Sequence, residues 1–309
     1  MITSFFKKST PINYSLLIIS MVLCYFLFHF QTESGFNTPI IAFSKIGYLG
    51  IIAATFFIIN FVVKKNNLTK DSTYTAFFYF VFMLFFPSIF DNPKILVTNF
   101  FILLALRRLI SLQTLKFPKE KIFDASFWIF IASIFQFWSV LFILVVYASI
   151  IFHVSRDYRN WLIPFVSFFT FVVIFTLFSF LLEPSLIGNY FQSAVINFNF
   201  DYFKNSFENL ALSIFSVVVL FFLVFLVFSI GNRPLNLQAS FKKVLLSLII
   251  SLVIFIISPN KTNDFLLLTF FPLATLATSF IEYNNNNKQK EIVLYGCLLL
   301  GTIAYFVQL

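Results

Sequence analysis

The sequence predicts an all-α protein, a polytopic membrane helix bundle of about eleven membrane segments, and three observations lead to this prediction. Sixty per cent of the 309 residues are apolar and 11% are charged, whereas a soluble domain carries about a quarter charged residues. The apolar residues form runs long enough to be membrane segments. Nearly all charges fall in the short polar stretches between these runs. A water-soluble surface cannot be built from this composition, so we expect the lipid bilayer to be the solvent.

The apolar runs define the segments in chain order. A hydrocarbon core about 30 Å thick needs roughly 20 helical residues, and fewer where protein shields a segment. The candidate segments are 13–30, 46–63, 74–90, 95–110, 124–136, 138–154, 161–182, 210–230, 244–258, 265–281 and 293–308. The first follows Lys7 and Lys8 without a small-x-small cleavage site, so we expect a retained signal anchor. We expect residues 1–309 to form a single integral membrane domain with no soluble domain.

The stretch 124–154 is the ambiguous element, because one helix of that length would rise about 46 Å. The positive-inside rule favours a short buried hairpin. A hairpin leaves only Lys45, Lys94, Lys204 and Lys261 outside, a split of 17 to 4, whereas a single crossing gives 12 to 9. The cytoplasmic cations are then Lys7, Lys8, Lys64, Lys65, Lys70, Arg107, Arg108, Lys116, Lys119, Lys121, Arg156, Arg159, Arg233, Lys242, Lys243, Lys288 and Lys290.

The hairpin turn must satisfy its own backbone. Both limbs are short, so we expect the turn near Gln136 to lie inside the bilayer, where lipid offers no hydrogen-bond partner. Ser133, Gln136 and Ser139 can supply partners, and we favour this structural role for Gln136 over a catalytic one. The topology places the N-terminus in the cytoplasm and the C-terminus, after the eleventh segment, on the periplasmic side.

Several function classes are disfavoured by composition and motifs. The net charge is +9, but the cations are spread over many loops without interleaved stacking aromatics, so no nucleic-acid partner is expected. Cys24 and Cys297 lie within apolar runs, which argues against redox chemistry or a thiolate metal site. His29 and His153 each lie near a segment end and form no recognisable ligand set, so no metal site is expected, and no sequence signature identifies a cofactor.

Carboxylates in the external loops are the candidate catalytic groups. Glu33 follows the first segment directly, and Asp91 occupies the second external loop. A first external loop with an acidic residue, a tight second loop and a buried hairpin resemble the membrane-embedded glycosyltransferases of the GT-C type. The stretch from Lys261 through Asp264 to Pro272 resembles the last core helix of those proteins.

The resemblance implies a reaction at the outer face of the membrane. The sugar donor would be a polyprenyl-phosphate-linked lipid, with Glu33 and Asp91 as the catalytic candidates. Lys94, Lys261 and Asp264 would bind the substrate, the two cations balancing the leaving phosphate. The whole chain also resembles an uncharacterised family of bacterial multi-pass envelope membrane proteins, which implies the bacterial inner membrane and contact with membrane lipids.

Three functions stay open at this point. The first is a GT-C-like protein acting on lipid-linked sugars for cell-envelope glycan assembly. The second is a noncatalytic membrane subunit or scaffold of an envelope assembly, secretion or motility complex with a membrane protein partner, because no complete catalytic motif is present. The third is a permease, although almost every charge falls at a segment end and few ionisable groups are left to couple transport.

Overall fold

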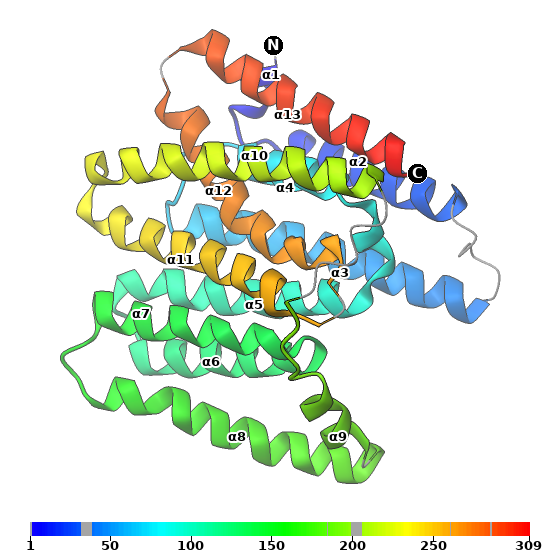
Figure 1. Cartoon of the computed structure of the whole chain (residues 1–309). Coiled ribbons are helices and arrows are strands. Elements are labelled where there is room, and N and C mark those ends of the chain that lie inside the picture. The colour runs from blue at the N-terminus through cyan, green and yellow to red at the C-terminus, as the bar shows by residue number, and fades with distance from the viewer. Residues whose placement is uncertain (1, 32–38, 184, 199–205, 260, 285) are drawn as a thin grey trace.

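A computed structural model describes residues 2–31, 39–183, 185–198, 206–259, 261–284 and 286–309, and these residues contain no strand. The predicted all-α class is confirmed, and the helices run back and forth along one direction (Figure 1). The α-helices are α1 (Ile2–Phe6), α2 (Pro11–Gln31), α3 (Pro39–Lys65), α4 (Tyr74–Leu84), α5 (Pro93–Ile110), α6 (Pro118–Phe135), α7 (Ile143–His153), α8 (Arg159–Leu182), α9 (Ser185–Gln192), α10 (Ser206–Ser229), α11 (Leu235–Ile257), α12 (Leu267–Tyr283) and α13 (Asn287–Gln308). Short 3₁₀ helices are η1 (Pro87–Asp91), η2 (Ser111–Thr114), η3 (Phe137–Phe142), η4 (Ile230–Asn232) and η5 (Asn263–Leu266).

Eight helices in the described ranges are long and apolar enough to cross a membrane: α2, α3, α5, α8, α10, α11, α12 and α13. Two apolar helices, Tyr74–Leu84 and Phe137–His153, are shorter. Together with α6, these ten correspond one to one with the eleven predicted segments. Several boundaries differ by six residues or more: α4 ends at Leu84, α6 begins at Pro118 and α13 at Asn287. The helices α3 and α11 also begin early, at Pro39 and Leu235. Lysine favours helix formation, so the helices continue through Lys45 and Lys243, which the sequence had placed in loops.

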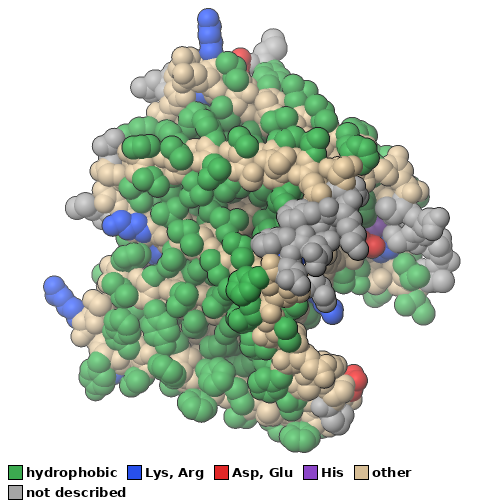
Figure 2. Space-filling view, in the orientation of Figure 1, with side chains coloured by type: hydrophobic (Ala, Val, Ile, Leu, Met, Phe, Trp, Pro, Cys, Tyr) green, Lys and Arg blue, Asp and Glu red, His purple; other side chains and the backbone are tan. Residues whose placement is uncertain are grey.

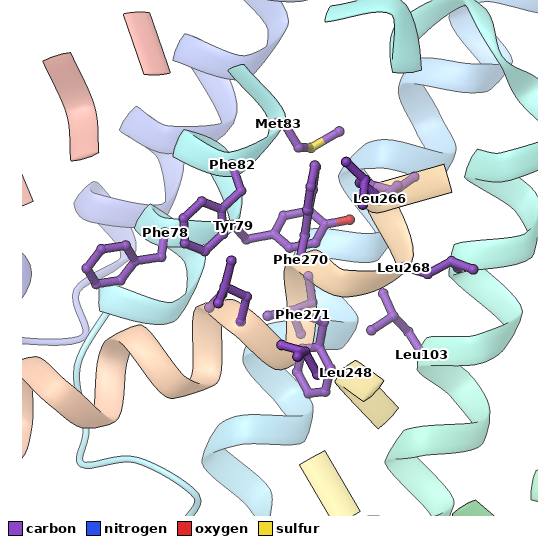
Figure 3. Close-up of a cluster of buried hydrophobic side chains, with 14 of the residues drawn as sticks. Phe78, Tyr79, Phe82, Met83, Leu103, Leu248, Leu266, Leu268, Phe270 and Phe271 are labelled. Atoms are coloured by element: carbon purple, nitrogen blue, oxygen red, sulfur yellow. The ribbon is translucent and has the colours of Figure 1, made fainter. Parts of the chain in front are cut away.

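Helices α4 and α12 form the centre of the bundle. Every residue of α4 is buried, and α12 is buried from Leu267 to Ile281. A helix of 11 residues rises only about 16 Å, so α4 cannot cross a bilayer alone and needs protein around it. Aromatic side chains fill the contact: the ring centroids of Phe82 and Phe215 lie 5.9 Å apart, and those of Phe215 and Phe270 5.7 Å. Figure 3 shows Phe82 of α4 and Phe270 of α12 among the buried apolar side chains where these two helices meet.

The outer helices expose apolar side chains. In the most apolar 18-residue stretch of α8, only 17% of the residues are buried. In the same helix, the side chains of Phe169 and Leu181 are 67% and 82% exposed. Figure 2 shows apolar side chains over most of the visible face. Such a surface is suited to hydrocarbon and would be costly in water. The chain is therefore built as a multi-pass membrane protein.

The predicted hairpin is confirmed. Helix α6 packs antiparallel to η3 and α7, and ion pairs at the open end join Arg108 to Asp124 (2.7 Å) and Lys119 to Asp157 (3.5 Å). At the turn, Ser139 Oγ donates to the Gln136 carbonyl at 2.7 Å. The Gln136 side chain reaches Ser258 Oγ at 2.9 Å, which ties the turn to the end of α11. Gln136 therefore has the structural role that the sequence favoured.

The helix ends gather at two opposite ends of the bundle. One contains residues 84–94, the hairpin turn, α9 and residues 257–259 and 261–264, and we call it the Asp91 end. The other contains residues 64–74, 107–121, 153–159, 283–284 and 286–290, and we call it the Arg107 end. The seventeen cations predicted to share one side all fall at the Arg107 end, whereas Lys45, Lys94 and Lys261 fall at the Asp91 end. Basic side chains protrude at the Arg107 end, on the left of Figure 2.

Gly301 lets α13 approach α4 closely. A Cβ atom there would lie 3.0 Å from the Val81 carbonyl oxygen and 3.2 Å from Val81 Cγ1. Because the first of these contacts is with backbone, it cannot be relieved by a side-chain rotation. Close backbone approach at small residues is one of the main sources of helix packing in membranes.

We expect Gly301→Leu to destabilise the protein, because the added side chain must push α13 away from α4. Overpacking of this kind costs about 1–3 kcal/mol, which should appear as a lower unfolding temperature in detergent. Gly296→Leu, on the same helix, is the control, since no atom lies within 4 Å of a Cβ built there. An equal loss in both variants would show that the α13 contact with α4 is not the cause.

Candidate functional site

A polar cluster lies where α2, α3 and η1 meet at the Asp91 end. It contains Tyr25 and His29 from the last turns of α2, Lys45 from the second turn of α3, and Asp91. His29 is fully buried and Lys45 is 4% exposed, whereas the Asp91 side chain is exposed. We call these four residues the Asp91 cluster. Figure 2 shows a histidine with acidic and basic side chains at this end, on the right.

Lys45 joins the two helices through both its backbone and its side chain. The Tyr25 hydroxyl donates to the Lys45 carbonyl at 2.9 Å, and Lys45 Nζ lies 3.0 Å from His29 Nδ1. An ammonium group can only donate, so Nδ1 accepts and the ring proton resides on Nε2. The Tyr25 and His29 rings also contact edge to face, with centroids 4.4 Å apart. Asp91 lies near enough to Tyr25 and His29 for its charge to act on both.

Asp264 anchors two loops at the same end. Ser88 Oγ donates to Asp264 Oδ1, and Asn92 Nδ2 donates to Oδ2 at 3.0 Å. Thr262 Oγ1 donates to the same Oδ2 at 3.3 Å. Asp264 itself is 6% exposed. Its buried carboxylate is thus held by neutral donors, which is how proteins accommodate a charge removed from water.

The segment from Ser88 to Asn92 connects this anchor to the Asp91 cluster. Ser88 and Asn92 face Asp264, and Asp91 lies between them in the chain. Asn92 also caps α5, because its Oδ1 accepts from the Ile95 amide at 3.4 Å and Pro93 occupies the first helical position. The position of Asp91 therefore depends on Asp264 through one short, doubly anchored turn.

The predicted substrate-binding cations have different surroundings. Lys261 is buried, and its removal from water lowers the pKa of its ammonium group. Lys94 is exposed in the first turn of α5, and the described residues give it no carboxylate partner. An exposed ammonium at a helix start can bind a phosphate group from outside the protein.

The structure brings Asp91, Lys94, Lys261 and Asp264 to one end of the bundle. Glu33, the other catalytic candidate, lies outside the described residues. Sequence reasoning missed the pairing of His29 with Lys45 and the roles of Ser88 and Asn92. The Asn92-Pro93 pair is a helix-start signature that could have revealed the cap, but nothing local indicated that Lys45 is buried against α2.

Groups of the kind that transfer protons or bind anions gather at this end. The described part of the chain contains no group of three or more His, Cys, Asp or Glu side chains that could hold a metal ion. It does place the His29 imidazole against the Lys45 ammonium, with the exposed carboxylate of Asp91 at the same end and further ammonium groups at Lys94 and Lys261.

Comparison with known proteins gives one match. The model of a family described as a family of unknown function (DUF6427) matches residues 13–309. No curated protein and no solved structure matches the chain.

We expect Asp264→Ala to destabilise the protein and Asp91→Asn to leave its stability unchanged. Removing the buried carboxylate leaves Ser88 and Asn92 without their acceptor, which costs about 1–3 kcal/mol. Substitution of the exposed Asp91 should stay within about 0.5 kcal/mol. Thermal unfolding of both variants in detergent measures the difference. Equal stability of the two would mean that Asp264 does not anchor the loops.

Proposed function

We propose that this chain, which belongs to the DUF6427 family of unknown function, acts on a polyprenyl-phosphate-linked sugar at the Asp91 end. The proposed reaction is glycosyl transfer of the kind that GT-C enzymes perform, in the service of cell-envelope glycan assembly. The observation that carries the proposal is the Asp91 cluster, in which His29 contacts the buried ammonium of Lys45 and the exposed carboxylate of Asp91 lies near enough for its charge to act on His29.

We further propose that the Asp91 end faces the outside of a bacterial inner membrane. The seventeen cations of the Arg107 end support this orientation, because cationic loops are retained in the cytoplasm. The N-terminus then lies in the cytoplasm and the C-terminus in the periplasm, and the cluster lies in the outer leaflet, where a lipid-linked sugar donor would be handled.

In the proposed reaction, a carboxylate of Asp91 or Glu33 accepts the proton of the acceptor hydroxyl. The acceptor oxygen forms a bond to the anomeric carbon of the sugar, and the bond between that carbon and the phosphate oxygen breaks. The leaving polyprenyl phosphate keeps the electron pair of that bond. Lys94 and Lys261 would balance its charge, and the Lys45 ammonium adds positive charge to the same region. Atoms and charge balance without a metal ion or redox step.

The alternative is a noncatalytic scaffold that binds a membrane protein partner. One observation favours it: Asp264 has its two oxygens occupied by Ser88, Asn92 and Thr262 and acts as a loop anchor. In this alternative the polar groups of the Asp91 end would maintain a rigid surface and bind no sugar donor. The Asp91 variant described next separates the two functions, because Asp91 has no such anchoring role.

We expect Asp91→Asn or Glu33→Gln, according to which of the two carboxylates is the base, to reduce sugar transfer by about 10²–10⁴-fold, the range that a general base contributes. Membrane vesicles containing the protein are incubated with a polyprenyl-phosphate-linked hexose whose sugar is radiolabelled, and the transfer of the radiolabel from the lipid is measured. Asp71→Asn, an exposed carboxylate at the Arg107 end, should transfer at the wild-type rate. Wild-type rates in both outer-end variants, with normal protein abundance, would contradict the catalytic proposal.

The orientation has its own test. Lys94→Cys should react with a membrane-impermeant maleimide in intact spheroplasts, whereas Lys242→Cys should react only after permeabilisation. In the parent protein Cys24 and Cys297, which both lie within helices, are replaced by Ala, so that the maleimide reacts only with the introduced cysteine. Labelling of position 242 from outside would reverse the orientation and move the proposed site to the cytoplasm.

A further inference from the structure

A groove with a basic rim lies between α3 and α5 at the Arg107 end, opposite the proposed catalytic site. Its volume is about 690 Å³, with Phe57 and Phe61 among the apolar lining residues and Lys64, Lys65 and Arg107 on its rim. We call it the Lys65 groove. A neighbouring cavity of about 440 Å³ between α2 and α3 shares Phe57, Asn60 and Lys64 with it. Both cavities therefore lie against the polar end of α3, one toward α2 and one toward α5.

The cations of the groove are arranged around one aromatic ring. The Arg107 guanidinium carbon lies 4.6 Å from the Phe61 ring centroid, and Lys65 Nζ lies 5.0 Å from it. Lys65 follows Phe61 by one helical turn, while Arg107 comes from α5. The two charges are thus held close together by a shared contact, although like charges repel. Cation–π contacts of this kind hold a guanidinium or ammonium group near a ring face.

Two neighbouring cations pair with carboxylates, and within the described ranges Lys65 and Arg107 do not. Arg108 pairs with Asp124 at 2.7 Å, and Lys64 pairs with Asp71 at 3.4 Å. The described residues provide no carboxylate partner for Lys65 or Arg107. Lys121 lies close enough to Lys65 and Arg108 for their charges to act on it, so the surrounding field is positive. An anion from outside the protein would complete this arrangement.

We propose that the Lys65 groove binds the headgroup phosphate of an anionic phospholipid, with its acyl chain lying along Phe57 and Phe61. A guanidinium binds phosphate oxygens in pairs, and an ammonium adds a point charge. The aromatic floor runs along α3 from its Lys65 end toward the middle of the helix. Phe57 and Phe61 are 64% and 41% exposed there, so an acyl chain and not water would cover them. Basic pockets between membrane helices bind anionic headgroups in this way. The site lies at the other end of the bundle from the Asp91 cluster, so it is independent of the proposed transferase activity.

The test is lipid binding by the purified full chain, measured by native mass spectrometry with dioleoyl phosphatidylglycerol and dioleoyl phosphatidylcholine. We expect one phosphatidylglycerol to bind about tenfold or more tightly than phosphatidylcholine. The double variant Lys65→Gln, Arg107→Gln should lose this preference, since each cation near a headgroup contributes to binding. The charge-matched control is Lys242→Gln, Lys288→Gln, which removes two exposed cations of the same end and should retain the preference.

A single variant and a competition with inorganic phosphate complete the test. Lys65→Gln alone changes an exposed side chain, so it should fold normally and still weaken phosphatidylglycerol binding about threefold or more. Millimolar inorganic phosphate should not displace the lipid. Displacement of the lipid by inorganic phosphate would show that the groove binds a free anion. An equal loss of the phosphatidylglycerol preference in the control double variant would show that general surface charge causes the preference. Either result would overturn the proposal, as would equal affinity for the two lipids.

Discussion

The structure depends on one constraint: a helix surrounded by hydrocarbon must satisfy all of its polar groups within the protein. Backbone groups are satisfied by helix formation, and hydroxyl groups inside the bundle follow the same rule. Ser247 and Ser251 in α11 donate to the carbonyls of Val244 and Ser247, and Thr275 in α12 donates to the Pro272 carbonyl. Because these hydroxyls need no partner on another helix, the central helices can carry polar residues and still pack against aromatic neighbours.

Packing, in turn, is provided mainly by aromatic side chains. The chain has 51 phenylalanines and seven glycines, so large rings and not small-residue stripes fill most helix interfaces. The short α4 illustrates the result, because it is buried on all sides and rings from α10 and α12 surround it. Gly301 is the exception that lets α13 approach α4. A core built this way keeps the ends of α4 and α12 fixed, and the turn that carries Asp91 begins three residues after α4.

Both histidines of the chain accept from a buried lysine. Lys45 lies 3.0 Å from His29 at the Asp91 end, and Lys243 lies 3.1 Å from His153 at the Arg107 end. Lys243 also donates to the Leu109 carbonyl at 2.7 Å, so it links α11 to α5 and α7. A neutral acceptor offsets part of the cost of burying an ammonium. The two lysine–histidine pairs differ in their surroundings, because only His29 has an exposed carboxylate, that of Asp91, near enough for its charge to act on the ring.

The sequence by itself determined the helical class, the eleven segments, the hairpin and the separation of the cations, because hydropathy and charge are properties of short stretches of chain. It also placed Asp91, Lys94, Lys261 and Asp264 at one end, since alternating segments fix which loops share a side. Only the tertiary structure decided that Asp264 is buried and anchors the turn carrying Asp91, and that Lys45 lies inside the bundle. Those facts depend on contacts between residues 16 to 176 positions apart, and no local pattern records which helix faces which.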